Sequence, residues 1–242
     1  MIGGSNVPFQ EDMEFRSQRL PGNQVRDFYR VIIKDIVDIG EPTTSRALQA
    51  LYWIKHTKEP LTERVLREAI GASSTDSILR PCMSLVVLSE NDKFFQFSHT
   101  TTVSEFLADP KNFEDLGATQ FDPFDLAKRC LEYLDSPEFE SIEVRNDEIR
   151  YKAVSSMYGF AGYAAEYWAH HVRDVEGDLL QGMDNLSHFK FLASKTKRDS
   201  MLKLNHRTTS TILHFAAEKG LSRFYSLCLD AKTRFVERRN SN

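Results

Sequence analysis

The sequence lacks the motifs by which many nucleotide-dependent and hydrolytic enzymes are recognised. Its 242 residues contain no G-x-x-x-x-G-K-[ST] loop, which would cradle nucleotide phosphates, and no G-x-S-x-G elbow, which would present a nucleophilic serine. Serines are numerous, but none lies in a motif that would activate its hydroxyl. We therefore predict a protein that is not an enzyme and that uses no cofactor.

Cysteine is scarce, and its spacing excludes the common cysteine-based sites. The three cysteines, Cys82, Cys130 and Cys228, are far apart in the chain and form no C-x-x-C pair. A zinc knuckle, a redox pair and a disulfide framework are therefore excluded as interpretations. Each cysteine lies in an apolar helical pattern, so we predict buried free thiols.

Long apolar runs are also missing. No stretch of about 18 apolar residues is present, and the first residues, MIGGSNVPFQEDMEF, have neither a basic nor an apolar segment of the kind found in signal peptides. We expect no membrane partner, no secretory signal and a cytoplasmic, reducing location.

The charge that is present is unevenly distributed. The net charge is −4, yet from Lys195 onward the chain has 11 basic residues against 4 acidic ones, and before it 20 against 31. The simpler interpretation is that the basic end is solvated. The alternative is electrostatic docking to an acidic partner.

Apolar periodicity in the first 110 residues predicts a small helical core with a hairpin. Helices are predicted over 23–40, 44–56 and 62–70, with Thr62 as the N-cap of the last. A short helix containing Pro81, strands at 86–88 and 94–97, and a brief helix around Phe106 follow. Three helices followed by a hairpin is the order of a winged helix.

Many winged helices bind DNA through a basic helix, but this sequence does not favour that function. The charged residues of the third helix cancel one another; they are Glu63, Arg64, Arg67 and Glu68. The attraction to phosphate that dominates DNA affinity is therefore missing, and we expect no nucleic-acid partner. A stand-alone winged-helix nucleic-acid-binding protein is the alternative function.

The second half of the chain reads as helical from Phe121 to about Lys195. A helix is predicted to start at Asp122-Pro123, a long one to cover 153–172, and a third to cover 179–193. An aromatic stripe recurs at helical spacing in the long helix: Phe160, Tyr163, Ala164, Tyr167, Trp168 and His171. We interpret this stripe as core.

Metal binding by the neighbouring histidines is not expected. His170 and His171 point about 100° apart on a helix, so they cannot hold one ion together, and no further ligand completes a set.

Residues 208–229 carry the most informative pattern in the chain. Leu213 and His214, then Ala216 and Ala217, then Gly220 form the skeleton of one ankyrin repeat. A single repeat cannot bury its apolar face and needs neighbours to stack on. The pattern therefore predicts a protein-interaction module, with its last helix pair less stable than the rest.

The order of these segments resembles a known family. The segments are LPGNQVRDFYRVIIKDI, ALQALYWIKHTKEPLTERVLREAI, SILRPCMSLVVL, FQFSHTTTVSEFL, YGFAGYAAEYWAHHVRD and TILHFAAEKGL. From about Leu20 to Asp230 the chain resembles the middle of fungal NACHT–ankyrin proteins of the STAND class, which are NLR-like signalling ATPases. Its first half is similar to the winged-helix domain named after GPI inositol-deacylase. Ile212 stands where the ankyrin pattern prefers proline, and Pro81 lies where the family helix usually has none.

The resemblance implies a role for His99. Phe97, His99, Thr101, Glu105 and Phe106 are similar to the family pattern F-x-H-x-[ST]-x-x-E-[FY]. In the family this histidine touches the phosphate of ADP bound to the NACHT core and holds the closed state. The alternative is that His99 only satisfies backbone groups at a strand-to-helix junction.

The expected fold is mainly α, with a winged helix and small β-hairpin, then a helical domain and a single ankyrin-like helix pair. The expected boundaries are a lead-in at 1–20, the winged helix at 21–110, the helical domain at 120–195 and the repeat at 205–235. The resemblance implies a non-catalytic regulatory segment whose partner is a protein: a NACHT core, in the same chain or another, or an ankyrin ligand. Its ankyrin residues, Leu213, His214, Ala216, Ala217 and Gly220, are expected to be structural.

Overall fold

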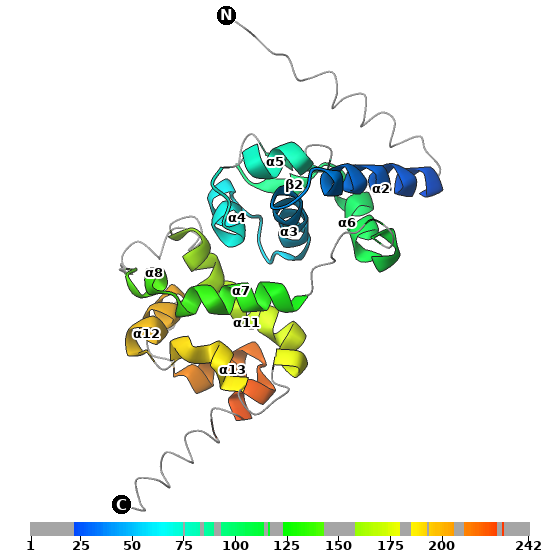
Figure 1. Cartoon of the computed structure of the whole chain (residues 1–242). Coiled ribbons are helices and arrows are strands. Elements are labelled where there is room, and N and C mark those ends of the chain that lie inside the picture. Colours follow the sequence, from blue (N-terminus) through cyan, green and yellow to red (C-terminus); the bar gives the residue numbers. More distant parts are fainter. Residues whose placement is uncertain are drawn as a thin grey trace, which may run out of the picture. The chain divides into compact units, whose positions relative to one another are not determined.

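The computed structural model is mainly helical, with one small antiparallel sheet of two strands. It describes residues 22–74, 76–82, 85–89, 93–113, 116, 123–142, 158–179, 185–192, 194–205, 211–226 and 229. The chain forms two compact units, Met1–Phe121 and Asp122–Asn242 (Figure 1). None of the helices in these ranges has the length and apolar character needed to cross a membrane.

The first unit consists of helices and the hairpin. Its elements are α2 (Gly22–Asp38), α3 (Thr43–His56), α4 (Glu63–Ile70), α5 (Asp76–Cys82), β1 (Val86–Leu88), β2 (Phe95–Phe97), α6 (Thr100–Ala108) and the 3-10 helix η1 (Pro110–Asn112). The predicted hairpin is confirmed, with Val86 opposite Phe97 and Leu88 opposite Phe95. An isolated bridge between Thr62 and Phe94 places the segment before α4 beside the second strand.

The core of this unit is made by one apolar face from each helix. On α3 and α4 the buried apolar residues are Ala47, Leu48, Ala50, Leu51, Trp53, Ile54, Val65, Leu66, Ala69 and Ile70. The N-cap prediction for Thr62 is confirmed, because its hydroxyl accepts a hydrogen bond from the Val65 N–H at 3.3 Å. Gly71 ends α4 in the left-handed conformation, with φ 66°, where a side chain would be strained.

Helix α2 is attached to α6 and η1 by both apolar and polar contacts. Tyr29 is buried, its ring lies 5.4 Å from that of Phe106, and its hydroxyl lies 3.1 Å from Thr102 Oγ1. Arg26 forms an ion pair of 3.1 Å with Asp109 beyond the end of α6. These contacts fix the position of α6, and with it the residue that precedes α6, His99.

The described residues of the second unit form helices and the turns between them, without a strand. Its elements are α7 (Pro123–Asp135), α8 (Pro137–Glu140), α11 (Phe160–Leu179), the 3-10 helix η2 (Asn185–Leu192), α12 (Lys195–Leu204) and α13 (Ile212–Lys219), and residues 222–226 are also helical. Helix α11 packs along α7, and α12 and α13 both contact α11. The helical segment and the last helix pair expected from the sequence therefore share one compact unit.

Two predictions for this unit were wrong. The basic segment from Lys195 onward was expected to be solvated. Its first residues instead form α12, which buries Met201, Leu202 and Leu204. The apolar residues of this segment are buried in the unit although the helix also carries four basic residues. The helix predicted over 179–193 also differs, because α11 continues to Leu179 and the later residues form η2, with non-helical dihedrals at Phe189.

The predicted aromatic stripe of α11 lies in the core. Phe160, Tyr163, Ala164 and Trp168 are fully buried, His171 is 4% exposed, and Tyr167 is half-buried. Four phenylalanines surround the Trp168 ring at centroid distances of 5.6–6.1 Å: Phe189, Phe191, Phe215 and Phe224. Phe189 and Phe191 come from η2 and Phe215 from α13, so one side chain joins three elements.

Trp168→Ala is expected to destabilise the second unit by about 3–5 kcal/mol, because it removes the ring that all four phenylalanines contact. Urea unfolding followed by far-UV circular dichroism measures this loss. Tyr167→Ala, a matched change at a half-buried position of the same helix, is expected to cost clearly less. Equal costs for the two changes would show that the ring cluster does not concentrate the stability of this unit.

The two described cysteines are free and fully buried. Burial raises the pKa of the Cys82 thiol to about 12. Burial also raises the pKa of Cys130, and the neighbouring Arg129 charge offsets this only in part. Both pKa values exceed neutral pH, so at pH 8 both groups are thiols and not the reactive thiolates. Cys228, predicted to be a third buried thiol, lies outside the described residues.

A Cys228→Ser chain is therefore expected to react with Ellman's reagent at pH 8 only when unfolded. The folded protein should show no fast-reacting thiol, and both thiols should react in about 6 M guanidinium chloride. Rapid reaction of either thiol in the folded chain would contradict its burial.

Candidate functional site

His99 lies at the junction between β2 and α6, as the residue that precedes the first turn of the helix. Its side chain is half-buried and makes no capping hydrogen bond to the helix. Its carbonyl accepts hydrogen bonds from the Val103 N–H at 3.0 Å and from Thr102 Oγ1 at 3.5 Å. The backbone of His99 thus begins α6, while its imidazole is not used as the cap.

The start of α6 has properties that favour negative charge. Residues Thr100 and Thr101 are exposed, and the first turn contains no acidic residue. The N–H groups of a first helical turn have no partner within the helix and carry the positive end of its dipole. An imidazole beside such a turn adds one hydrogen-bond donor. The arrangement is chemically suited to contact an anionic group, as the resemblance implies for His99.

The ankyrin-like residues form a well-capped helix in the second unit. The Thr211 hydroxyl accepts from the His214 N–H at 3.4 Å and lies 3.2 Å from His214 Nδ1. His214 is exposed, so this contact belongs to its own helix cap and not to a neighbouring repeat. Gly220 ends α13 in the left-handed conformation, with φ 71°.

The apolar residues of this pattern are distributed between the core and the surface. Ala216 is fully buried and Leu213 half-buried, whereas Ala217 is exposed. Leu221 and Phe224 continue the buried side, and Leu229 is 38% exposed. The helix pair therefore has a face in contact with α11 and an outward face with small and polar residues.

The two neighbouring histidines of α11 face different surroundings. His171 is buried, and its Nε2 lies 2.9 Å from the Tyr163 hydroxyl. The His170 ring lies 5.9 Å from that of Tyr167. The pairing with Tyr163 gives His171 a structural role, since each of these polar groups would otherwise lose a hydrogen bond in an aromatic core.

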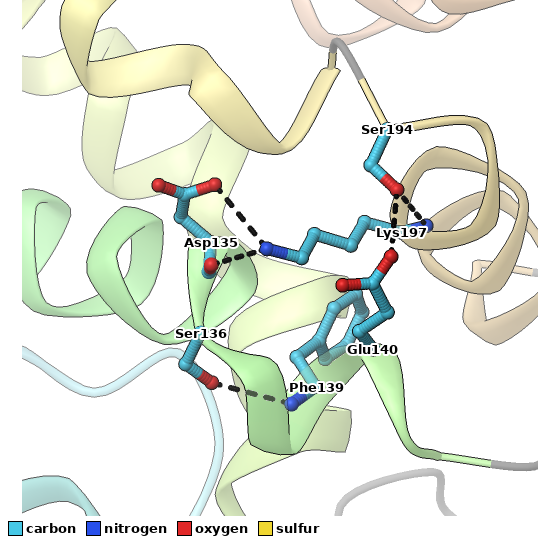
Figure 2. Close-up of polar contacts among 6 residues, drawn as sticks. All are labelled: Asp135, Ser136, Phe139, Glu140, Ser194 and Lys197. Carbon is cyan, nitrogen blue, oxygen red and sulfur yellow. Dashed lines mark hydrogen bonds and ion pairs between the residues drawn. The ribbon is translucent and has the colours of Figure 1, made fainter.

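A buried lysine joins α12 to the end of α7 through polar contacts (Figure 2). The Lys197 side chain is 11% exposed and lies 3.4 Å, measured from Nζ, from Asp135 Oδ1 at the end of α7. The ammonium also donates to the Asp135 carbonyl. A cation at this position complements the negative end of the α7 dipole and satisfies a terminal carbonyl.

Ser194 adds a further contact between α12 and the α7–α8 turn, and Ser136 caps the short helix α8. Ser194 caps α12 by accepting from the Lys197 N–H at 3.3 Å, and it donates to Glu140 Oε1 at 3.2 Å. Ser136 caps α8 by accepting from the Phe139 N–H at 3.2 Å (Figure 2). At the start of α8, the backbone N–H of Glu138 and then the Ser136 hydroxyl lower the pKa of the Glu138 carboxyl. We call Asp135, Glu140, Ser194 and Lys197 the α12 clamp.

Sequence reasoning missed the α12 clamp. The local signals were present, because Ser194 is a good N-cap and Met201 and Leu204 have helical spacing. The many basic residues of this segment led instead to the interpretation of a solvated end. Nothing local to Lys197 indicates that its partner is Asp135, which lies 62 residues earlier.

No protein-family model, no curated protein and no solved structure matches the chain.

Lys197→Met is expected to destabilise the second unit by about 1–2 kcal/mol, because it keeps the aliphatic stem but removes the charged donor to Asp135. Lys195→Met, a matched change at an exposed position of α12, is expected to stay within about 0.5 kcal/mol of the parent. Each unit contains one tryptophan, so in a Trp53→Phe background the urea transition of Trp168 fluorescence reports on the second unit alone. Equal stability of the two lysine variants would show that the clamp adds nothing.

Proposed function

We propose that the chain is a non-catalytic regulatory and protein-interaction segment of a STAND-class NACHT–ankyrin signalling protein. In this proposal its first unit is a winged helix that docks on a nucleotide-binding core. Its second unit carries an ankyrin-like helix pair whose outward face is available to a protein ligand.

The observation that carries the proposal is the element order of the first unit. A helix (α3) is followed by the extended residue Thr62, two helices (α4 and α5) and the β1–β2 hairpin. Thr62 bridges Phe94 just before the second hairpin strand. A helix, an edge segment, two helices and a hairpin make up the winged-helix arrangement, and this order supports that assignment.

The position of His99 supports docking on an anionic ligand held by a partner. The residue follows the hairpin after Ser98, directly precedes α6, and its imidazole does not cap the helix. Contacts from Tyr29 to Thr102 and from Arg26 to Asp109 hold α6 in place. A donor mounted on a fixed helix start is suited to contact a nucleotide phosphate presented by another domain.

The charges of the first unit favour a protein partner over nucleic acid. Helix α5 directly precedes the hairpin, which is the position of the DNA-reading helix in a winged helix, and it carries one acid, Asp76, and one base, Arg80. On α4, Arg64 is paired with Glu68 at 2.8 Å. Neither helix presents the excess of positive charge on which phosphate-backbone binding depends.

The direct test is binding of the full chain to a purified NACHT core encoded in the same genome, loaded with ADP and measured by biolayer interferometry. We expect His99→Ala to weaken this binding at least about fivefold, the loss of one hydrogen bond to a charged group. His214→Ala, the same change in the second unit, is expected to leave the affinity within about twofold.

Three results would contradict the proposal. The first is the absence of binding to any NACHT core. The second, equal binding by the His99→Ala chain, would remove the role of that residue. The third is retention on DNA that falls steeply with salt, which would favour the nucleic-acid-binding alternative.

A further inference from the structure

Helix α2 has one exposed side over residues 24–38. Its opposite side is buried in the first unit through Tyr29, Ile32, Ile33 and Ile36. In Figure 1, α2 lies along the edge of this unit, and it contacts α3 and α6. The helical repeat places Asp27, Val31, Asp35 and Asp38 on the exposed side. Lys34 is exposed on the same side. We call Asp27, Val31, Asp35 and Asp38, with Ile39 directly after the helix, the acidic face of α2.

Apolar and acidic side chains alternate on this face in a defined pattern. Val31 and Ile39 are 58% and 53% exposed, and they are two of the three large apolar side chains that are exposed among the described residues. Asp27 lies one turn before Val31 and Asp35 one turn after it. An apolar centre with a carboxylate on each side is thus presented on a single helix.

The carboxylates on the two sides of Val31 are not neutralised within the described part of the chain. Lys34 pairs with Asp38 at 2.9 Å, whereas the side-chain carboxylates of Asp27 and Asp35 make no hydrogen bond or ion pair to any described residue. The face therefore carries a net negative charge next to exposed apolar surface. Binding there is favoured for a partner that brings cations together with an apolar side chain.

We propose that the acidic face of α2 is a docking surface for a basic amphipathic helix of a protein partner. The matching element has a bulky apolar residue with a lysine or arginine one turn before it and one turn after it. Helical spacing in the partner repeats the four-residue spacing of Asp27, Val31 and Asp35, so both ion pairs form while the apolar side chain covers Val31. This surface is separate from His99 and goes beyond the function proposed above.

The negative charge of the acidic face of α2 disfavours other classes of ligand. A symmetric contact with a second copy would bring Asp27 and Asp35 towards the same acidic face, and like charges facing each other are destabilising. Anionic lipid headgroups and nucleic-acid phosphates are repelled for the same reason. A basic peptide is the class of ligand that gains from both the charge and the apolar surface.

A defined probe tests the proposal with the full chain. The probe is a fluorescein-labelled 14-residue helical peptide of leucine and lysine, with lysines one turn on either side of a leucine; the control peptide has glutamate in place of lysine. Binding is measured by fluorescence anisotropy at low and at physiological salt. We expect saturable binding of the lysine peptide only, weakened by salt.

Matched variants locate the binding. Asp27→Lys/Asp35→Lys is expected to raise the dissociation constant at least about tenfold, and Val31→Ser about threefold. Glu132→Lys/Asp174→Lys, which makes the same charge change at exposed positions of the second unit, is expected to stay within about twofold. Lysine is a good helix former, so circular dichroism should show unchanged helix content in all variants.

Any of three outcomes overturns the proposal. One is the absence of saturable binding by the lysine peptide. Another is equal binding by the glutamate peptide. The last is equal weakening by the two double variants, which would mean that the peptide responds to net charge and not to the acidic face of α2.

Discussion

The second unit depends on one buried side chain. Trp168 contacts Phe189 and Phe191 of η2, Phe215 of α13 and Phe224 in the final helical residues. Its buried Nε1 has no hydrogen-bond partner, so the ring contributes through apolar and ring-to-ring contacts. A short helix pair has too little apolar surface to be stable alone, and the ring of α11 supplies the face on which it packs. Residues 211–226 are therefore part of a larger core.

Polar contacts specify how the helices of this unit are arranged around that ring. The α12 clamp joins the end of α7 to the start of α12, and Ser194 serves both as helix cap and as donor to Glu140. Most buried polar groups in proteins are hydrogen-bonded, and a pairing with defined geometry permits few alternative arrangements. Apolar burial thus supplies most of the stability, while the clamp fixes the register of α12 against α7.

The first unit separates its stabilising residues from the residues available to partners. Its core is an interior of aliphatic and aromatic side chains contributed by α2, α3, α4, α5, both strands and α6. His99 and the acidic face of α2 lie outside that core on elements that the core holds rigid. Side chains placed at the surface of packed helices suit regulated protein contacts, because little conformational entropy is lost when a partner binds. Both proposals for this unit rest on that separation.

The sequence by itself determined most of the elements and several of their ends. Periodicity located α3, α4 and the buried stripe of α11, Thr62 and Thr211 capped helices as their residue types favour, and Gly220 ended one. The candidate residue His99 was found only through the resemblance, and the acidic face of α2 needed the exposure of Val31. Tertiary structure alone decided that Lys197 meets Asp135 and that Phe215 stacks on Trp168. The physical reason is that caps and periodicity act within a few residues of chain, whereas these pairs are brought together only when distant helices bury their apolar faces against each other.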